Sequence, residues 1–294
     1  MSSGQFPVNE PVHAESPDQA VDTKPELGAE SGKPASPIKD PLGPPTIYGL
    51  VSFLLDAEAA ILWGTLSILG YITLKFFINS VYYSQSEGIG QMAALLFFVM
   101  FVAVGLLFLS IMSVSGLAIV RDTANSATRV ENWPGINILD WLPESFYVVN
   151  ALFFSAMPGA LVAQVLILFG AGLWLITPLA GLTAFFLFPA LLLSLVISNS
   201  PINPSEPMVW RSLRSSTNAW KRFYIIAAVM AAISMAAFAL MYVPVPMLPF
   251  CSAVLIVTVT LAYFRLLGRL LWTLVDEAID QEVEEKIQQP SDLP

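Results

Sequence analysis

Six long apolar stretches separated by short polar segments dominate the chain beyond residue 45. They cover about 59–82, 91–119, two parts of 145–199, 223–242 and 250–273. A helix needs about 20 apolar residues to cross a bilayer, so this pattern predicts an all-α fold, a polytopic transmembrane helical bundle with six membrane spans. Within 145–199, we expect the turn between two spans to fall around residues 170–178, where Gly and Pro interrupt the apolar run.

Three regions follow from the change in composition. Residues 1–45 contain nine prolines and a single aromatic residue, which predicts a disordered Pro-rich tail. Residues 46–275 form the six-helix transmembrane domain, and 276–294 form an acidic helix or tail that continues the last span. The first 40 residues show no basic and apolar leader, so we expect the first membrane helix to act as an uncleaved anchor.

Asp56 and Glu58 decide where the first span begins. A carboxylate at the centre of a membrane helix costs about 2.5–3.5 kcal/mol. We therefore expect 46–57 to lie along the membrane interface and the first span to start near Ala59, with Lys75 reaching the headgroups from the far part of that span.

Basic residues alternate between the loops. The loops after the second and fourth spans and the end of the last span carry Lys and Arg, whereas the loops after the first, third and fifth spans carry none. By the positive-inside rule, both termini are expected in the cytoplasm. The net charge of −9 belongs to the two tails, because 46–275 is close to neutral, which argues against a nucleic-acid partner.

The chemistry available to the chain is narrow. Cys251 is the only cysteine and His13 the only histidine, which excludes a cysteine metal site, a bis-histidine haem and a histidine-based zinc protease. We expect no catalytic residue, no cofactor and no metal. The acids Glu131, Asp140 and Glu144 are interpreted as a solvated face because nothing in their spacing defines a pocket.

Two loops carry interfacial patterns. The segment 204–225 has the spacing of one amphipathic helix, with Ser205 as its cap and Pro207 in its first turn. Tryptophans on one side and cations on the other are typical of contact with headgroups of an anionic inner leaflet. The loop 129–141 is built in a similar order, with a proline-containing break and then a Trp-bearing interfacial segment before the next span. The predicted membrane-interface residues are Trp133, Trp141, Trp210, Arg211, Arg214, Trp220, Lys221 and Arg222.

Few polar side chains fall inside the predicted spans. Lys75, Asn150 and Gln164 are the candidates for an intramembrane polar cluster, which a transporter would use to line a path. Ala228, Ala232 and Ala236 recur every fourth residue and predict close packing of the fifth span within the bundle.

Three stretches, ENWPGINILDW at 131–141, PSEPMVWRSLRSSTNAWKRFYI at 204–225 and YFRLLGRLLW at 263–272, are similar to a group of uncharacterised six-span inner-membrane proteins of planctomycete-type bacteria. The resemblance covers under a fifth of the chain. It implies a bacterial inner membrane, and no activity or site residue.

The leading functional hypothesis is a non-enzymatic scaffold, assembly or regulatory component that acts through its cytoplasmic loops and tails, by binding a cytoplasmic protein or by self-association. The alternative is a transporter or channel for a small or lipidic solute. A third class, an enzyme acting on lipids, would need the cytoplasmic acids and arginines to converge on one pocket.

Overall fold

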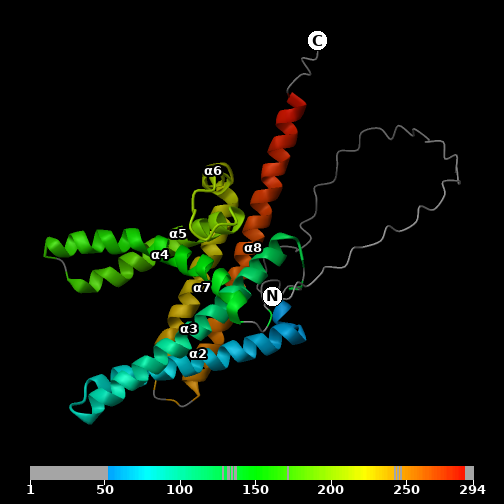
Figure 1. Ribbon diagram of the computed structural model, residues 1–294. Helices are drawn as coiled ribbons and strands as arrows, with labels where there is room; N and C mark the ends of the chain where they lie inside the picture. The colour runs from blue at the N-terminus through cyan, green and yellow to red at the C-terminus, as the bar shows by residue number, and fades with distance from the viewer. Residues whose placement is uncertain are drawn as a thin grey trace, which may run out of the picture. The chain divides into compact units, whose positions relative to one another are not determined.

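The computed structural model describes residues 52–288, apart from positions 128, 131–132, 134, 136–137, 171, 242, 244 and 246. Within this part of the chain all regular structure is helical (Figure 1). The elements are η1 (Ser52–Leu55), α2 (Ala57–Ser84), α3 (Ile89–Ala124), α4 (Ile138–Leu168), η2 (Leu173–Leu175), α5 (Ile176–Ile197), α6 (Pro207–Ser215), α7 (Thr217–Leu240) and α8 (Leu248–Gln288). The predicted tail 1–45 and residues 46–51 of the predicted interfacial segment lie outside the described residues.

The prediction of six membrane spans is confirmed. Six helices are long and apolar enough to cross a bilayer: α2, α3, α4 from Trp141, α5, α7, and α8 as far as Ile279. The first span begins at Ala57, so Asp56 and Glu58 lie at its amino end, where carboxylates interact favourably with the helix dipole. The turn between α4 and α5 falls at 169–175 and includes Gly170 with φ of 92°, a backbone conformation that favours glycine.

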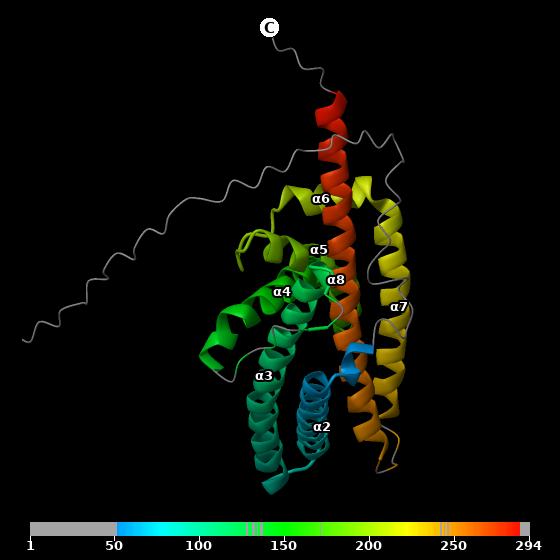
Figure 2. The same ribbon diagram turned by 90° about the vertical axis from the view of Figure 1, so that its right-hand side faces the viewer.

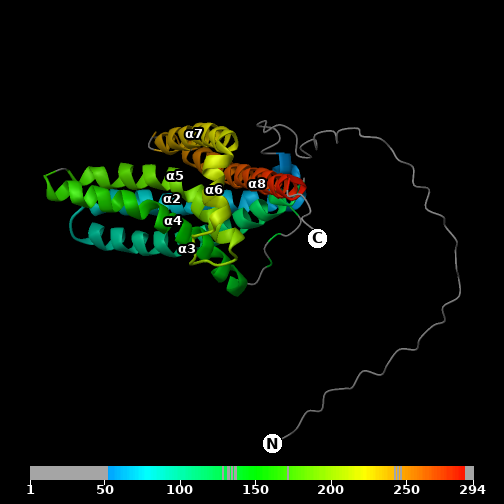
Figure 3. The same cartoon turned by 90° about the horizontal axis from the view of Figure 1, so that it is seen from above.

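The spans form three helical hairpins. Helix α2 packs along α3, α4 along α5, and α7 along α8 (Figures 2 and 3). Helix α8 connects two of the hairpins because it also contacts α2 and α3, and α3 in turn contacts α4. Of the six spans, α8 is the most buried within the protein.

Burial is concentrated at one end of these hairpins. In α3 the buried run extends from Met112 to Val120, while most of the first half of that helix is exposed. In α5 it covers Pro189–Leu195, and in α8 the buried residues cluster between Leu261 and Leu274. We call this the packed end; it is where α2 and α7 begin and where α3 and α5 end. The exposed apolar surface elsewhere suits contact with lipid chains.

Two glycines bring α3 and α8 together at the packed end. A Cβ atom built on Gly268 would lie 2.8 Å from the backbone oxygen of Val120 and 2.7 Å from the Cβ of Thr123. A Cβ on Gly116 would lie 2.6 Å from ring atoms of Phe264. Small residues at such crossings let membrane helices approach closely.

Hydrogen bonds between helices lie beside the prolines inside α4 and α5. Next to Pro158, the backbone N–H of Gly159 donates to the Thr183 hydroxyl oxygen at 3.2 Å, which links α4 to α5. In the turn before Pro189, the Phe186 carbonyl accepts a hydrogen bond from Tyr224 of α7. Such bonds support the turns that the prolines disturb.

The prediction of one helix over 204–225 is wrong. Helix α6 ends at Ser215, and α7 begins at Thr217 after Ser216, whose backbone (φ −105°, ψ 41°) leaves the helical region. Pro207 does occupy the first turn of α6, as expected. Ser205 does not cap that helix, because the N-cap position belongs to Glu206, which makes no side-chain capping hydrogen bond.

Candidate functional site

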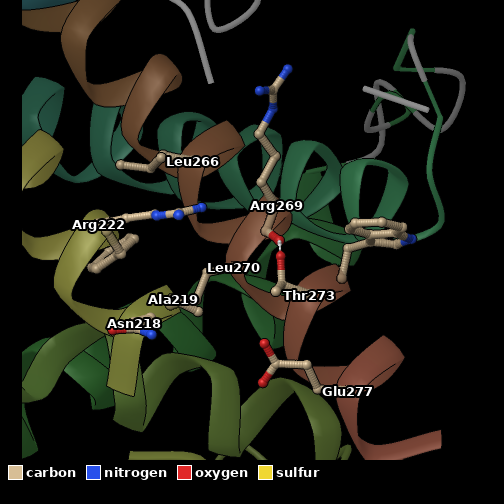
Figure 4. Close-up of a pocket in the computed structure, with 10 residues that line it drawn as sticks. Asn218, Ala219, Arg222, Leu266, Arg269, Leu270, Thr273 and Glu277 are labelled. Atoms are coloured by element: carbon tan, nitrogen blue, oxygen red, sulfur yellow. Dashed lines mark hydrogen bonds between the residues drawn. The ribbon is translucent and has the colours of Figure 1, made fainter. Parts of the chain in front are cut away.

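The site with the most polar chemistry is a cavity of about 230 Å³ between the start of α7 and the outer part of α8 at the packed end (Figure 4). Its lining residues are Asn218, Ala219, Arg222, Phe223, Leu266, Arg269, Leu270, Trp272, Thr273 and Glu277. We call it the α7–α8 pocket.

Two polar pairs face each other across this pocket. On α7, Asn218 and Arg222 are four residues apart and therefore share a helix face. On α8, Thr273 and Glu277 have the same spacing. Arg222 extends toward α8 and Glu277 extends back toward the start of α7, whereas the guanidinium of Arg269 points away from Glu277 (Figure 4).

Glu277 is held in place by the bend between α6 and α7. The hydroxyl of Ser216, which is buried, donates a hydrogen bond to a carboxylate oxygen of Glu277. The same bend is stabilised from its other side, since the indole N–H of Trp220 donates to the Ser212 hydroxyl at 3.1 Å. The carboxylate therefore has a fixed position at the amino end of α7.

The pocket lies at the depth of lipid headgroups. At 1.5 Å per residue, about 27 Å of helix separate Arg222 from Leu240 at the far end of α7, and about 32 Å separate Arg269 from Leu248 at the far end of α8. The hydrocarbon core of a bilayer is about 30 Å thick. Both positions thus reach one membrane interface when the helix ends lie at the other.

The residues of α6 and α7 that were predicted at the membrane interface divide into exposed side chains and one buried side chain. Trp210, Arg211 and Arg214 are exposed, and they line a shallow hollow on the outer side of α6. Lys221 and Arg222 are also exposed. For Trp220 the prediction of an interface position is wrong. Its side chain is only 3% exposed and stacks on Tyr224, because the bend at Ser216 turns it into the protein.

The loop between α3 and α4 is tied to the packed end. Trp133 is partly buried against the core, and the indole of Trp141 donates to the Gly135 carbonyl at 2.8 Å. Glu144 forms an ion pair of 2.7 Å with Arg121 at the end of α3, so it does not belong to a merely solvated face. Glu131 lies outside the described residues, as does the side chain of Asp140.

The loop between α5 and α6 is also held in place by hydrogen bonds. Asn150 of α4 donates from its amide to the Pro201 carbonyl at 2.9 Å. The Ser194 hydroxyl donates to the Pro204 carbonyl and accepts from the backbone N–H of Glu206, both at 2.7 Å. These bonds fix the start of α6 against α4 and α5.

The three candidates for an intramembrane cluster do not come together. About 21 Å of helix separate Asn150 from Gln164 on α4. Asn150 is engaged with the α5–α6 loop, and Gln164 is exposed. Lys75 lies on α2, with its ammonium 5.7 Å from the ring centre of Tyr71. These residues therefore do not line one path.

The alanine stripe of α7 also differs from expectation. Ala228, Ala232 and Ala236 are exposed, while Ala227 and Ala237 are buried. The stripe was predicted to pack inside the bundle, but the face of α7 that carries Ala227 and Ala237 is the buried one. Regular spacing alone does not show which of two small faces is buried.

The arginines at the end of the last span, Arg265 and Arg269, were expected at the inner membrane interface; they are only 4% and 8% exposed, so protein covers them instead of lipid headgroups. The guanidinium carbon of Arg265 lies 4.8 Å from the ring centre of Phe53 in η1, a cation–π arrangement. Their flanking residues Leu266, Leu267, Leu270 and Leu271 are all buried, and these two pairs of leucines beside the arginines were the signal in the sequence.

Among the residues that the structure describes, no three His, Cys, Asp or Glu side chains are grouped as a metal site would require. The fold and the arrangement of polar groups define an all-α, multi-pass integral membrane protein with its structured polar elements at one end of the helices. The chain matches no protein-family model, and comparisons with curated proteins and with solved structures find no similar protein.

Proposed function

We propose that the protein is a non-enzymatic scaffold or regulatory component of a bacterial inner membrane, with its packed end and both termini in the cytoplasm. The observation that carries this proposal is the continuity of α8, which runs from Leu248 to Gln288. Its membrane part is the most buried span, and about 17 Å of the same helix follow Glu277. A partner bound to that extension is coupled directly to the centre of the bundle.

The distribution of polar groups supports a binding role over transport. The intramembrane candidates are apart, whereas α6, the α5–α6 loop and the bend at Ser216 are joined by hydrogen bonds at the packed end. The extension of α8 is acidic, with Glu282, Glu284 and Glu285 in its last turns. A basic surface on a cytoplasmic protein is the complementary partner.

Photo-crosslinking in intact cells tests this proposal. A photoreactive residue at Ile279, which is exposed, is expected to give a protein adduct that disappears when Glu282, Glu284 and Glu285 are changed to Lys. A probe at Ile89, exposed at the opposite end of the spans, serves as the matched control and should be unaffected. Lipid-only adducts at Ile279, or a protein adduct that survives the charge reversal, would contradict the proposal.

Transport of a lipidic solute is the second candidate, and one cavity favours it. About 280 Å³ lie between α4, α5, α7 and α8, lined mainly by apolar residues such as Phe185, Phe188 and Met230. The change Ala231→Trp would fill this cavity. Loss of solute movement in reconstituted vesicles would support transport, and vesicles in which the unaltered protein moves no lipidic solute would exclude it.

A further inference from the structure

We infer that the α7–α8 pocket binds a phosphoethanolamine group, with the phosphate at Asn218 and Arg222 and the ammonium at Glu277. This inference goes beyond the scaffold proposal and does not depend on it, because it concerns a small ligand and a different part of α8. The chemistry follows from three features of the pocket: its paired charges, its size and its depth.

The paired charges define a zwitterionic ligand. Arg222 is a cation and Glu277 an anion, and both line the pocket from opposite helices. Among the described residues the ion pairs within 4 Å join Arg121 to Glu144 and Arg129 to Asp56, so Arg222 and Glu277 do not neutralise each other directly. A ligand with one negative and one positive group pairs with both.

Each charge has a polar neighbour suited to its ligand group. Asn218 lies one turn before Arg222 and offers an amide N–H to phosphate oxygens, while Arg222 offers a planar set of donors. On α8 the carboxylate of Glu277, fixed by Ser216, is positioned to accept from an ammonium.

The size of the pocket and its depth in the membrane favour a lipid headgroup over a larger solute as its ligand. The cavity of about 230 Å³ is smaller than the roughly 300–1,000 Å³ of pockets that enclose drug-sized molecules. It lies at headgroup depth, and its floor of Phe223, Leu266 and Leu270 is apolar. A phospholipid placed here would direct its acyl chains along that floor. The same zwitterion can also arrive as free phosphoethanolamine.

Lipid retention by the full-length protein in detergent, measured by native mass spectrometry, tests the inference. Phosphatidylethanolamine and phosphatidylglycerol are offered in equal amounts. The unaltered protein is expected to retain phosphatidylethanolamine at least fivefold better, since phosphatidylglycerol has no ammonium. Glu277→Gln should abolish that preference while leaving phosphatidylglycerol retention unchanged, and Arg222→Gln should weaken retention of both lipids.

Matched controls separate the pocket from its surroundings. Asp276→Asn and Lys221→Gln each remove the same charge one residue away from a lining position, and both should behave like the unaltered protein. Ser216→Ala removes the hydrogen bond to Glu277 but keeps the carboxylate, so the lipid preference should persist. This variant distinguishes ligand binding from a role of Glu277 in folding alone.

Soluble phosphoethanolamine distinguishes the two sources of the ligand. Displacement of phosphatidylethanolamine by a comparable concentration of phosphoethanolamine would identify the free phosphate ester as the ligand, and resistance to it would identify the lipid. Equal retention of the two lipids by the unaltered protein would overturn the inference. The same effect of Glu277→Gln and Asp276→Asn on retention would also overturn it.

Discussion

The hydroxyl of Tyr224 on α7 donates a hydrogen bond of 2.6 Å to the backbone carbonyl of Phe186 on α5, three residues before Pro189. Proline has no amide hydrogen, and the carbonyl that loses its helical donor is that of Phe185, four residues before Pro189. The carbonyl of Phe186 lies in the same disturbed turn, and its bond to Tyr224 connects two hairpins.

Tyr224→Phe should lower the free energy of unfolding by about 1 kcal/mol, because hydrogen bonds between membrane helices average about 0.6 kcal/mol and reach about 1.7. Denaturant unfolding in micelles measures the change. In a Pro189→Ala background the restored amide hydrogen reaches the carbonyl of Phe185 and not that of Phe186, so the same substitution should cost about as much. A much smaller cost in that background would contradict this and show that the Tyr224 bond depends on the proline.

The glycine contacts between α3 and α8 give a second prediction. Gly268→Ala should destabilise the protein by about 1–3 kcal/mol, because the new methyl group meets the backbone of Val120, which cannot move aside easily. Gly64→Ala on α2 is the control, since nothing lies within 4 Å of its added Cβ. In thermal unfolding, Gly268→Ala should therefore have a clearly lower melting temperature than Gly64→Ala. Similar melting temperatures would contradict the close approach of α3 and α8.

The ion pair between Arg121 and Glu144 is expected to contribute little to stability. Their side chains are 41% and 32% exposed, and ion pairs this accessible are worth about 0–1 kcal/mol. Glu144→Gln should therefore lower the free energy of unfolding by less than about 1 kcal/mol. The double variant Arg121→Glu with Glu144→Arg, which restores the ion pair with its charges exchanged, should have nearly the stability of the unaltered protein. A loss of several kcal/mol in unfolding experiments would instead indicate that the pair is shielded from water.

Labelling of introduced cysteines tests the predicted topology. In a Cys251→Ser background, Ser86→Cys lies in the exposed α2–α3 turn and Ser215→Cys at the exposed end of α6. A membrane-impermeant thiol reagent added to intact cells should modify the first and spare the second. Ser215 is a better reporter than Ser216, whose side chain is buried against Glu277. The reverse labelling pattern would show that the topology is opposite to the predicted one.

The number of spans could be predicted because bilayer thickness sets a minimum apolar length for every crossing helix, whereas the helices themselves run beyond the predicted limits, as α3 does to Ala124. Gly170 marked the α4–α5 turn for a local reason, its left-handed backbone. The bend at Ser216 could not be predicted in the same way. Helical periodicity continues across it, and the contact that supports the bend comes from Glu277, 61 residues further along the chain.

The α7–α8 pocket could not be predicted from the sequence either, because it is also formed by residues that lie far apart in the chain. Arg222 was recognised as an interface residue and Glu277 lies in the segment 276–294 that was predicted as an acidic helix or tail, but nothing local shows that the two helices bring them to one cavity. Trp220 was assigned to the membrane surface because tryptophan and arginine so often occur together there. Its burial depends on the direction that α7 takes after the bend.

The continuity of α8 also has a mechanical consequence. Its 41 residues extend for about 61 Å, and after Pro249 in the first turn no further proline interrupts them. A membrane helix adjusts its tilt to the thickness of the surrounding bilayer. Because α8 is unbroken and packed among α2, α3 and α7, a tilt of the bundle as a whole is transmitted along it and moves the segment after Glu277 through a wider arc.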